Sequence, residues 1–160
     1  MSAHIALIKG DGIGADVCDA TTYLVDLCLR LVGEAPLAIT KIDAGAAYFQ
    51  ETGADIEAGG EDIASRCDAI FLGAIGLPSI RHTNGTEISP HLRLRERFQL
   101  YAGVRPVKAY PNIPQKLADP RAASIDFIVI RESTEGLFHS AAVHNRSHIE
   151  ADFAVEETMR

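Results

Sequence analysis

The sequence lacks any apolar run close to the roughly 20 residues that a membrane-spanning helix needs. Its N-terminus also lacks the basic segment and apolar core of a signal peptide, because Lys9 and the glycines from Gly10 onward interrupt the short apolar run at 5–8. We therefore expect a cytoplasmic protein with no membrane partner. The length of 160 residues, with 47% hydrophobic and 23% charged residues, is typical of about one globular domain.

Cysteine is scarce and positive charge is in deficit. Cys18, Cys28 and Cys67 have no CxxC spacing, which favours reduced, partly buried thiols.

The net charge of −7 argues against a nucleic-acid partner, since binding phosphates needs a basic face. The segment 93–108 is an exception, with five basic residues and one acidic residue. Such a local cationic patch suits a small anionic ligand.

Apolar periodicity predicts alternating strands and helices. The predicted strands are 4–8, 37–42, 67–76, 101–110 and 125–132, and the predicted helices lie at 14–32, within 44–53, at 59–66 and from Pro90 to about Phe98. The helix 14–32 has one apolar stripe, formed by Val17, Ala20, Leu24, Leu27 and Leu31. This order predicts an α/β protein with βαβ units and a mostly parallel sheet flanked by helices. The continuous apolar run IDFIVI at 125–130 further predicts a strand buried on both faces.

The best-known nucleotide motifs are absent from the glycine turn at 10–14. Gly10, Gly12 and Gly14 form G-x-G-x-G rather than the G-x-G-x-x-G of a dinucleotide fingerprint, and no GK[ST] follows. An acidic residue does follow the second predicted strand, but Asp43 comes about 30 residues after Gly14, later than the fingerprint requires. Taken alone, the turn is compatible with another kind of phosphate loop or with a plain tight turn.

Four longer stretches, in order, carry more information than the turn. They are IALIKGDGIGADV, GAIGLP, LRLRERFQLYAGVRPVKAYPNIP and IDFIVIRESTEGLF, and together they resemble the isocitrate/isopropylmalate dehydrogenase family of metal-dependent β-decarboxylating dehydrogenases, including its tartrate-dehydrogenase-like members. The resemblance implies an isopropylmalate-dehydrogenase-like α/β fold that is incomplete in this chain. It assigns residues 1–104 to the first part of the large domain, and 105–160 to the start of the smaller domain that serves dimerisation and substrate binding.

The resemblance also implies an activity. It predicts an oxidoreductase that transfers a hydride from a 2-hydroxy di- or tricarboxylic acid, such as isopropylmalate, tartrate, malate or isocitrate, to NAD or NADP. Mg²⁺ or Mn²⁺ would assist β-decarboxylation, with metal ligands in a C-terminal half and none in this chain. The implied partners are the anionic substrate and further copies of the chain, as a homodimer or higher homo-oligomer.

Three arginines are expected to bind the carboxylates of the substrate. The resemblance assigns Arg95, Arg105 and Arg131 to this role, and guanidinium groups independently match carboxylates with two parallel hydrogen bonds. Arg131 ends an apolar strand, where an idle charge would be costly. Ser89 is either a fourth substrate contact or simply the N-cap of the helix that begins at Pro90.

The cofactor is expected at the glycine turn. The resemblance places Gly12 and Ile13 near the nicotinamide end of the cofactor, with glycines that let the backbone approach the ligand. It places Glu87, in NGTEISP, beside the same end. Arg93 and Arg97 are expected to face solvent, since each lies two residues from Arg95 on a helix.

The sequence departs from the family pattern at the catalytic tyrosine, because RESTEGLF has Phe138 at that position. Phenylalanine has no proton to donate to the enolate left by decarboxylation. Either the protein oxidises its substrate without efficient decarboxylation, or His139 or water supplies the proton.

The sequence also departs from the family pattern in its length, because family members are roughly twice as long. We therefore expect this sequence to be a fragment or part of a longer protein. The alternative function is therefore a non-catalytic homologue or inactive fragment that acts as an anion-binding or assembly module.

Overall fold

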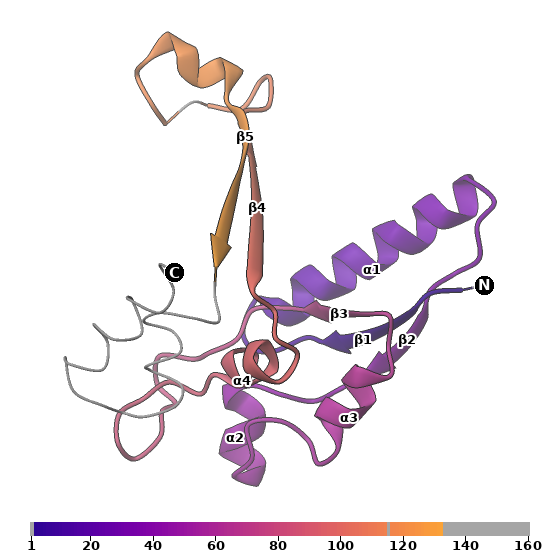
Figure 1. Cartoon of the computed structure of the whole chain (residues 1–160), viewed down its shortest axis with the longest axis vertical. Coiled ribbons are helices and arrows are strands. Elements are labelled where there is room, and N and C mark those ends of the chain that lie inside the picture. Colours follow the sequence, from indigo (N-terminus) through magenta and orange to yellow (C-terminus); the bar gives the residue numbers. More distant parts are fainter. Residues whose placement is uncertain (1, 115, 133–160) are drawn as a thin grey trace, which may run out of the picture. The chain divides into compact units, whose positions relative to one another are not determined.

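The computed structural model describes residues 2–114 and 116–132 (Figure 1). The chain divides into two compact units, Met1–Leu94 and Arg95–Arg160, and this boundary falls within the helix Pro90–Arg97. The predicted domain division after residue 104 stays a prediction.

The first unit is built on a three-stranded parallel sheet with strand order β2-β1-β3. Its strands are β1 (His4–Ile8), β2 (Ala38–Lys41) and β3 (Ala69–Leu72). Ile5 of β1 pairs with Ile39 on one side and Ala69 on the other. The predicted βαβ organisation is confirmed, and the carboxyl ends of the three strands lie at one edge, where α/β proteins bind ligands.

Four helices accompany this sheet, close to their predicted positions. They are α1 (Gly14–Leu31), α2 (Ala46–Thr52), α3 (Gly60–Ser65) and α4 (Pro90–Arg97). α1 lies over one face of the sheet and α3 against the other (Figure 1). The centre of the core is β1, where Ala6 and Ile8 are fully buried, as is Cys18 of α1. Burial is also the main reason that the pKa of the Cys18 thiol is raised.

The apolar stripe predicted on α1 points away from the sheet. Its leucines and valine are 41–77% exposed: Val17, Leu24, Leu27 and Leu31. The sheet is instead faced by Thr21, Thr22 and Val25, which line an open apolar cavity of about 250 Å³ together with Leu7 and Phe71. Periodicity identified the stripe correctly, but it carries no information about which surface covers it.

The second unit contains an antiparallel ribbon of β4 (Ala102–Lys108) and β5 (Asp126–Glu132). Lys108 lies opposite Asp126, and their side chains form an ion pair of 2.8 Å. The two predicted strands are confirmed. The prediction that 125–130 is buried on both faces is wrong for the described residues, because Ile128 is 60% and Ile130 73% exposed. The chain doubles back between the strands, so they pair antiparallel without a crossover helix to cover either face.

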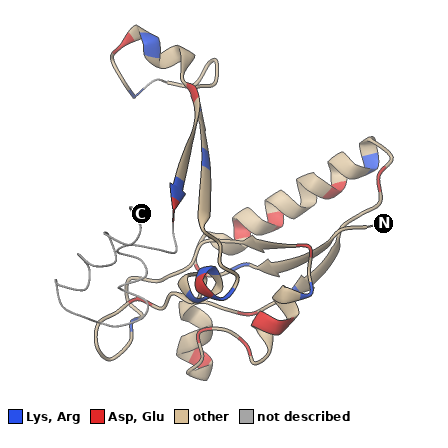
Figure 2. Ribbon diagram, viewed as in Figure 1, with Lys and Arg blue, Asp and Glu red and all other residues tan. Residues whose placement is uncertain are grey.

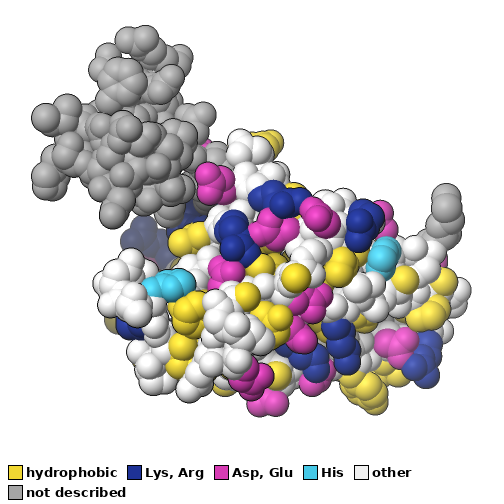
Figure 3. Space-filling model, turned by 90° about the horizontal axis from the view of Figure 1, so that it is seen from below, with side chains coloured by type: hydrophobic (Ala, Val, Ile, Leu, Met, Phe, Trp, Pro, Cys, Tyr) yellow, Lys and Arg dark blue, Asp and Glu magenta, His cyan; other side chains and the backbone are white. Residues whose placement is uncertain are grey.

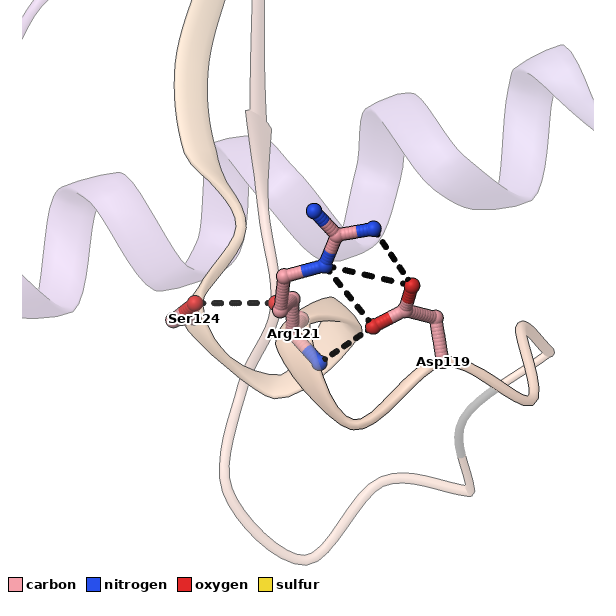
Figure 4. A network of polar contacts seen from close by, with 3 residues as sticks. All are labelled: Asp119, Arg121 and Ser124. Carbon is pink, nitrogen blue, oxygen red and sulfur yellow. Dashed lines mark hydrogen bonds and ion pairs between the residues drawn. The ribbon is translucent and has the colours of Figure 1, made fainter.

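The loop between β4 and β5 ends in a short 3-10 helix, η1 (Pro120–Ser124). Asp119 caps it: the carboxylate accepts hydrogen bonds from the backbone N–H of Arg121 at 2.9 Å and from its Nη2 at 2.7 Å (Figure 4). These bonds lower the pKa of Asp119. The cap therefore stabilises η1 at neutral pH and is lost as the pH falls through that lowered pKa.

Candidate functional site

Gly10 and Gly14 let the turn after β1 pack against the loop after β3. A β-carbon at Gly10, where φ is +70°, would overlap the carbonyl oxygen of Ala74. A β-carbon at Gly14 would lie 2.8 Å from Ala74 N and nearer still to the carbonyl oxygen of Lys9. The expectation that these glycines make room for a ligand is therefore corrected for Gly10 and Gly14, since the chain's own backbone occupies that space.

Gly12 and Ile13, by contrast, form an exposed tip. Gly12 has φ +53°, with only a Leu77 methyl group reaching 4.0 Å from a β-carbon there. Ile13 is 71% exposed and precedes the first residue of α1. The assignment of these two residues to a cofactor stays a prediction.

Asp11 is a buried charged residue that the sequence analysis missed. It is 4% exposed, and its carboxylate accepts three backbone hydrogen bonds. Oδ2 accepts from the N–H of Ala46 at 2.8 Å and of Gly76 at 2.7 Å, and Oδ1 accepts from the N–H of Ala47 at 2.8 Å. A β-carbon at Gly45 would lie 2.6 Å from Oδ2, so glycine there makes room for the carboxylate. The available signal was a charge between two glycines directly after a buried strand, where an unsatisfied carboxylate would be costly.

Glu87 lies at the end of a loop that Arg81 closes. Arg81 Nη2 donates to Glu87 Oε1 at 2.9 Å, and Nη1 donates to the carbonyl oxygen of Gly85 at 3.1 Å. The Glu87 side chain remains 69% exposed, and an isolated bridge joins the backbones of Arg81 and Glu87. Ser89 is half-buried at the start of α4, where its carbonyl oxygen accepts from Leu92 N–H at 3.0 Å. Its role as a substrate contact or as the N-cap stays a prediction.

Arg93 does more than face solvent. Its Nη1 lies 3.1 Å from Asp55 Oδ1, and its Nε forms an ion pair with Glu61 of α3. Basic and acidic side chains adjoin over the face seen in Figure 3, rather than forming separate patches. The prediction that Arg93 faces solvent is confirmed, since its side chain is 46% exposed, but the sequence did not predict the two half-buried carboxylates with which it pairs. Arg97 is exposed as expected, whereas Arg95 is half-buried.

Arg105 and Arg131 are brought together by the register of the β4–β5 ribbon, whose two strands both carry basic segments (Figure 2). Arg131 lies opposite Gly103, and Arg105 lies two residues further along β4, opposite Val129. Residues directly opposite or two apart project from the same face, so the two arginines are diagonal neighbours about 7–8 Å apart at Cα. Arg95 lies on α4, outside this register. Arg105 occupies the middle of β4 rather than a strand end, whereas Arg131 is next to the end of β5.

Within residues 2–114 and 116–132, no three His, Cys, Asp or Glu side chains form a group that could hold a metal ion, so no described side chain is assigned to one. Phe138 lies outside the described residues. No helix of this described part is both long and apolar enough to cross a membrane.

Comparison with known proteins matches residues 4–159 to the model of the isocitrate/isopropylmalate dehydrogenase family. The 3-isopropylmalate dehydrogenase of Heyndrickxia coagulans is 35% identical over 143 residues, which cover 86% of this chain and 38% of the relative. The decarboxylating D-malate dehydrogenase of Escherichia coli K12 is 30% identical, with 98% of this chain and 43% of the relative covered.

The fold agrees with that match. The crystal structure of isocitrate dehydrogenase from Methylococcus capsulatus superposes with a TM-score of 0.65 at 26% identity, covering 87% of this chain and 37% of that one. The chain thus spans about two-fifths of the length of these relatives. A family match over almost the whole sequence and a shared α/β fold agree, and the chain belongs to the isocitrate/isopropylmalate dehydrogenase family.

Proposed function

We propose that the chain serves the oxidation of a 2-hydroxy acid bearing at least two carboxylates, with NAD or NADP as hydride acceptor. The observation that carries this proposal is the diagonal pair of Arg105 and Arg131 on one face of the ribbon. Two guanidinium groups at this separation can each hold a carboxylate of one small substrate, and they stay charged at any working pH.

The proposal gives each of the predicted site residues a role. Arg105 and Arg131 bind and orient the carboxylates, with Arg95 and Ser89 as further substrate contacts. Gly12, Ile13 and Glu87 contact the nicotinamide end of the cofactor. A bound nicotinamide would accept the hydride, and a bound Mg²⁺ or Mn²⁺ would polarise the hydroxyl group and then stabilise the enolate left by decarboxylation. The residues of this chain mainly position the reactants.

The domain division after residue 104 and a homodimeric or larger homo-oligomeric assembly belong to the same proposal. They are supported by membership of the family, whose smaller domain would begin near Arg105.

The test separates binding from turnover. Calorimetry with malonate, D-malate, tartrate, 3-isopropylmalate and isocitrate measures binding, and absorbance at the NAD(P)H band measures turnover with Mn²⁺ and each nucleotide. We expect dicarboxylate binding that Arg105→Gln and Arg131→Gln each weaken, while Arg121→Gln, in the exposed η1 segment, leaves it unchanged. Failure of every dicarboxylate to bind would refute the proposal.

A second candidate function is a non-catalytic anion-binding or assembly module. It is favoured by phenylalanine at position 138, where the family resemblance implies a catalytic tyrosine. Dicarboxylate binding without any nucleotide reduction would select it.

Phe138→Tyr tests the decarboxylation step. If Phe138 limits that step, the variant releases more carbon dioxide per hydride transferred than the parent, because tyrosine can donate a proton to the enolate. An unchanged ratio would show that another group, such as His139 or water, supplies the proton.

A further inference from the structure

Asp11 joins three segments that are distant in sequence. Among the described residues, it is the one charged residue that is buried. Its carboxylate binds the first two N–H groups of α2 and the N–H of Gly76 in the loop after β3. Its own backbone N–H donates to the carbonyl oxygen of Ala74 at 2.7 Å. The turn, the start of α2 and the loop after β3 therefore share one charged centre.

The number and spread of these bonds go beyond the capping of one helix. Both carboxylate oxygens are used, and the bond to Gly76 is the shortest of the three. Hydrogen bonds from backbone amides to a buried charge are stronger than those to a neutral acceptor. A neutral side chain of the same shape cannot reproduce the arrangement, because asparagine has one acceptor oxygen where Asp11 uses two.

The residues that follow Asp11 are the exposed tip. Gly12 and Ile13 lie between this anchored carboxylate and Gly14, which is itself packed against Ala74. A β-carbon at Gly12 would have only a Leu77 methyl group within 4.0 Å, so little packing surrounds the tip there. The position of the tip is thus set from its two ends.

We propose that Asp11 is a positioning residue that locks the turn, the start of α2 and the loop after β3 into one unit and so fixes the Gly12–Ile13 tip for contact with a nicotinamide nucleotide. The nucleotide part of this inference rests on the proposed function. The locking of the three segments does not.

Amide hydrogen exchange on the 160-residue chain tests the lock. In Asp11→Ala, the N–H groups of Ala46, Ala47 and Gly76 lose protection together. In Asp11→Asn, one acceptor oxygen remains. Either the N–H of Ala47 or the N–H groups of Ala46 and Gly76 stay protected, and the others lose protection. Unchanged protection of all three in Asp11→Ala would overturn the proposal.

Ligand affinity tests the consequence for the tip. We expect Asp11→Asn to bind NADH about tenfold more weakly and malonate as the parent does, because the ribbon arginines belong to the other unit. Two controls should bind both ligands normally: Asp43→Asn removes an exposed charge, and Ile42→Val removes a buried methyl group from the same unit.

The other possible results of these binding measurements would overturn the positioning role of Asp11 or the nucleotide part of the proposal. Equal loss of NADH and malonate binding, or a loss that Ile42→Val reproduces, would reduce Asp11 to a general stabiliser and overturn its positioning role. A parent chain that binds no NADH would refute the nucleotide part of the proposed function. The exchange pattern would then decide the lock by itself.

Discussion

Replacing Gly14 with alanine tests why the glycine turn has this sequence. Gly14 is buried at the first position of α1, and its φ lies outside the left-handed range, so the backbone conformation itself would accept alanine. The obstacle is space. A β-carbon would lie 2.8 Å from Ala74 N and 2.9 Å from Ala74 O, with the carbonyl oxygen of Lys9 closer still.

The two effects of this substitution have opposite signs. Alanine in place of a helical glycine gains about 0.5–1 kcal/mol, whereas forcing an extra carbon into a packed site costs about 1–3 kcal/mol. The cost falls at the upper end of that range, because the neighbouring atoms belong to the backbone and hydrogen bonds hold that backbone in place. Asp11 N–H donates to Ala74 O, and Gly73 N–H donates to Ile8 O, both at 2.7 Å. We therefore expect Gly14→Ala to lose about 2 kcal/mol of unfolding free energy.

Urea unfolding followed by far-ultraviolet circular dichroism measures this loss, and amide exchange locates it. Gly33→Ala is the matched control: it has φ +75° but no atom within 4 Å of a β-carbon. It should lose about 1 kcal/mol through backbone strain alone and leave the exchange of Asp11 and Gly73 unchanged. A Gly14→Ala chain as stable as the parent would refute the steric explanation.

Three further predictions concern charge and thiol chemistry. Arg105→Gln and Arg131→Gln each weaken malonate binding by about 1.5–3 kcal/mol, by calorimetry, and lysine at either position fails to restore it because it lacks the planar fork; full rescue by lysine would argue for a simple charge effect. Arg93→Gln lowers the unfolding free energy by no more than about 1 kcal/mol, because half-exposed ion pairs are screened; the loss should shrink in high salt, and a salt-independent loss would contradict this account. Exposed Cys28 reacts with iodoacetamide before Cys18, whose raised pKa leaves less thiolate at a given pH; faster labelling of Cys18 by mass spectrometry would show that α1 opens readily.

Local patterns were sufficient for the elements of the first unit. The helix beginning at Gly14 follows from a glycine turn before an apolar periodic segment, and the helix beginning at Pro90 follows from proline at its first position. Hydrogen bonding within a helix and the alternation of a strand depend on neighbours in sequence, so periodicity reports them. The same patterns could not assign partners, which is why the ion pairs of Arg93 with Asp55 and Glu61 were not predicted.

The direction in which a surface faces was beyond the sequence. The stripe of α1 and the apolar run of β5 were both identified, but the first points away from the sheet and the second is open to solvent in the described residues. Apolar composition measures how much surface can be buried. It does not say which part of the protein packs on that surface. The sequence therefore predicted that both faces of β5 are buried, although no described segment covers them.

The sequence by itself determined the class of this protein and its strand and helix order, because these depend on residue type, spacing and ordered motifs. Substrate binding by Arg95, Arg105 and Arg131 stays a prediction from those motifs. Only the tertiary structure placed Arg105 beside Arg131, since their neighbourhood depends on the register of two strands separated by a long loop. Only it revealed Asp11 as a buried centre of three hydrogen bonds, and it showed that Gly10 and Gly14 serve contacts within the chain. These relationships join residues far apart in sequence, and no local pattern encodes the distance between them.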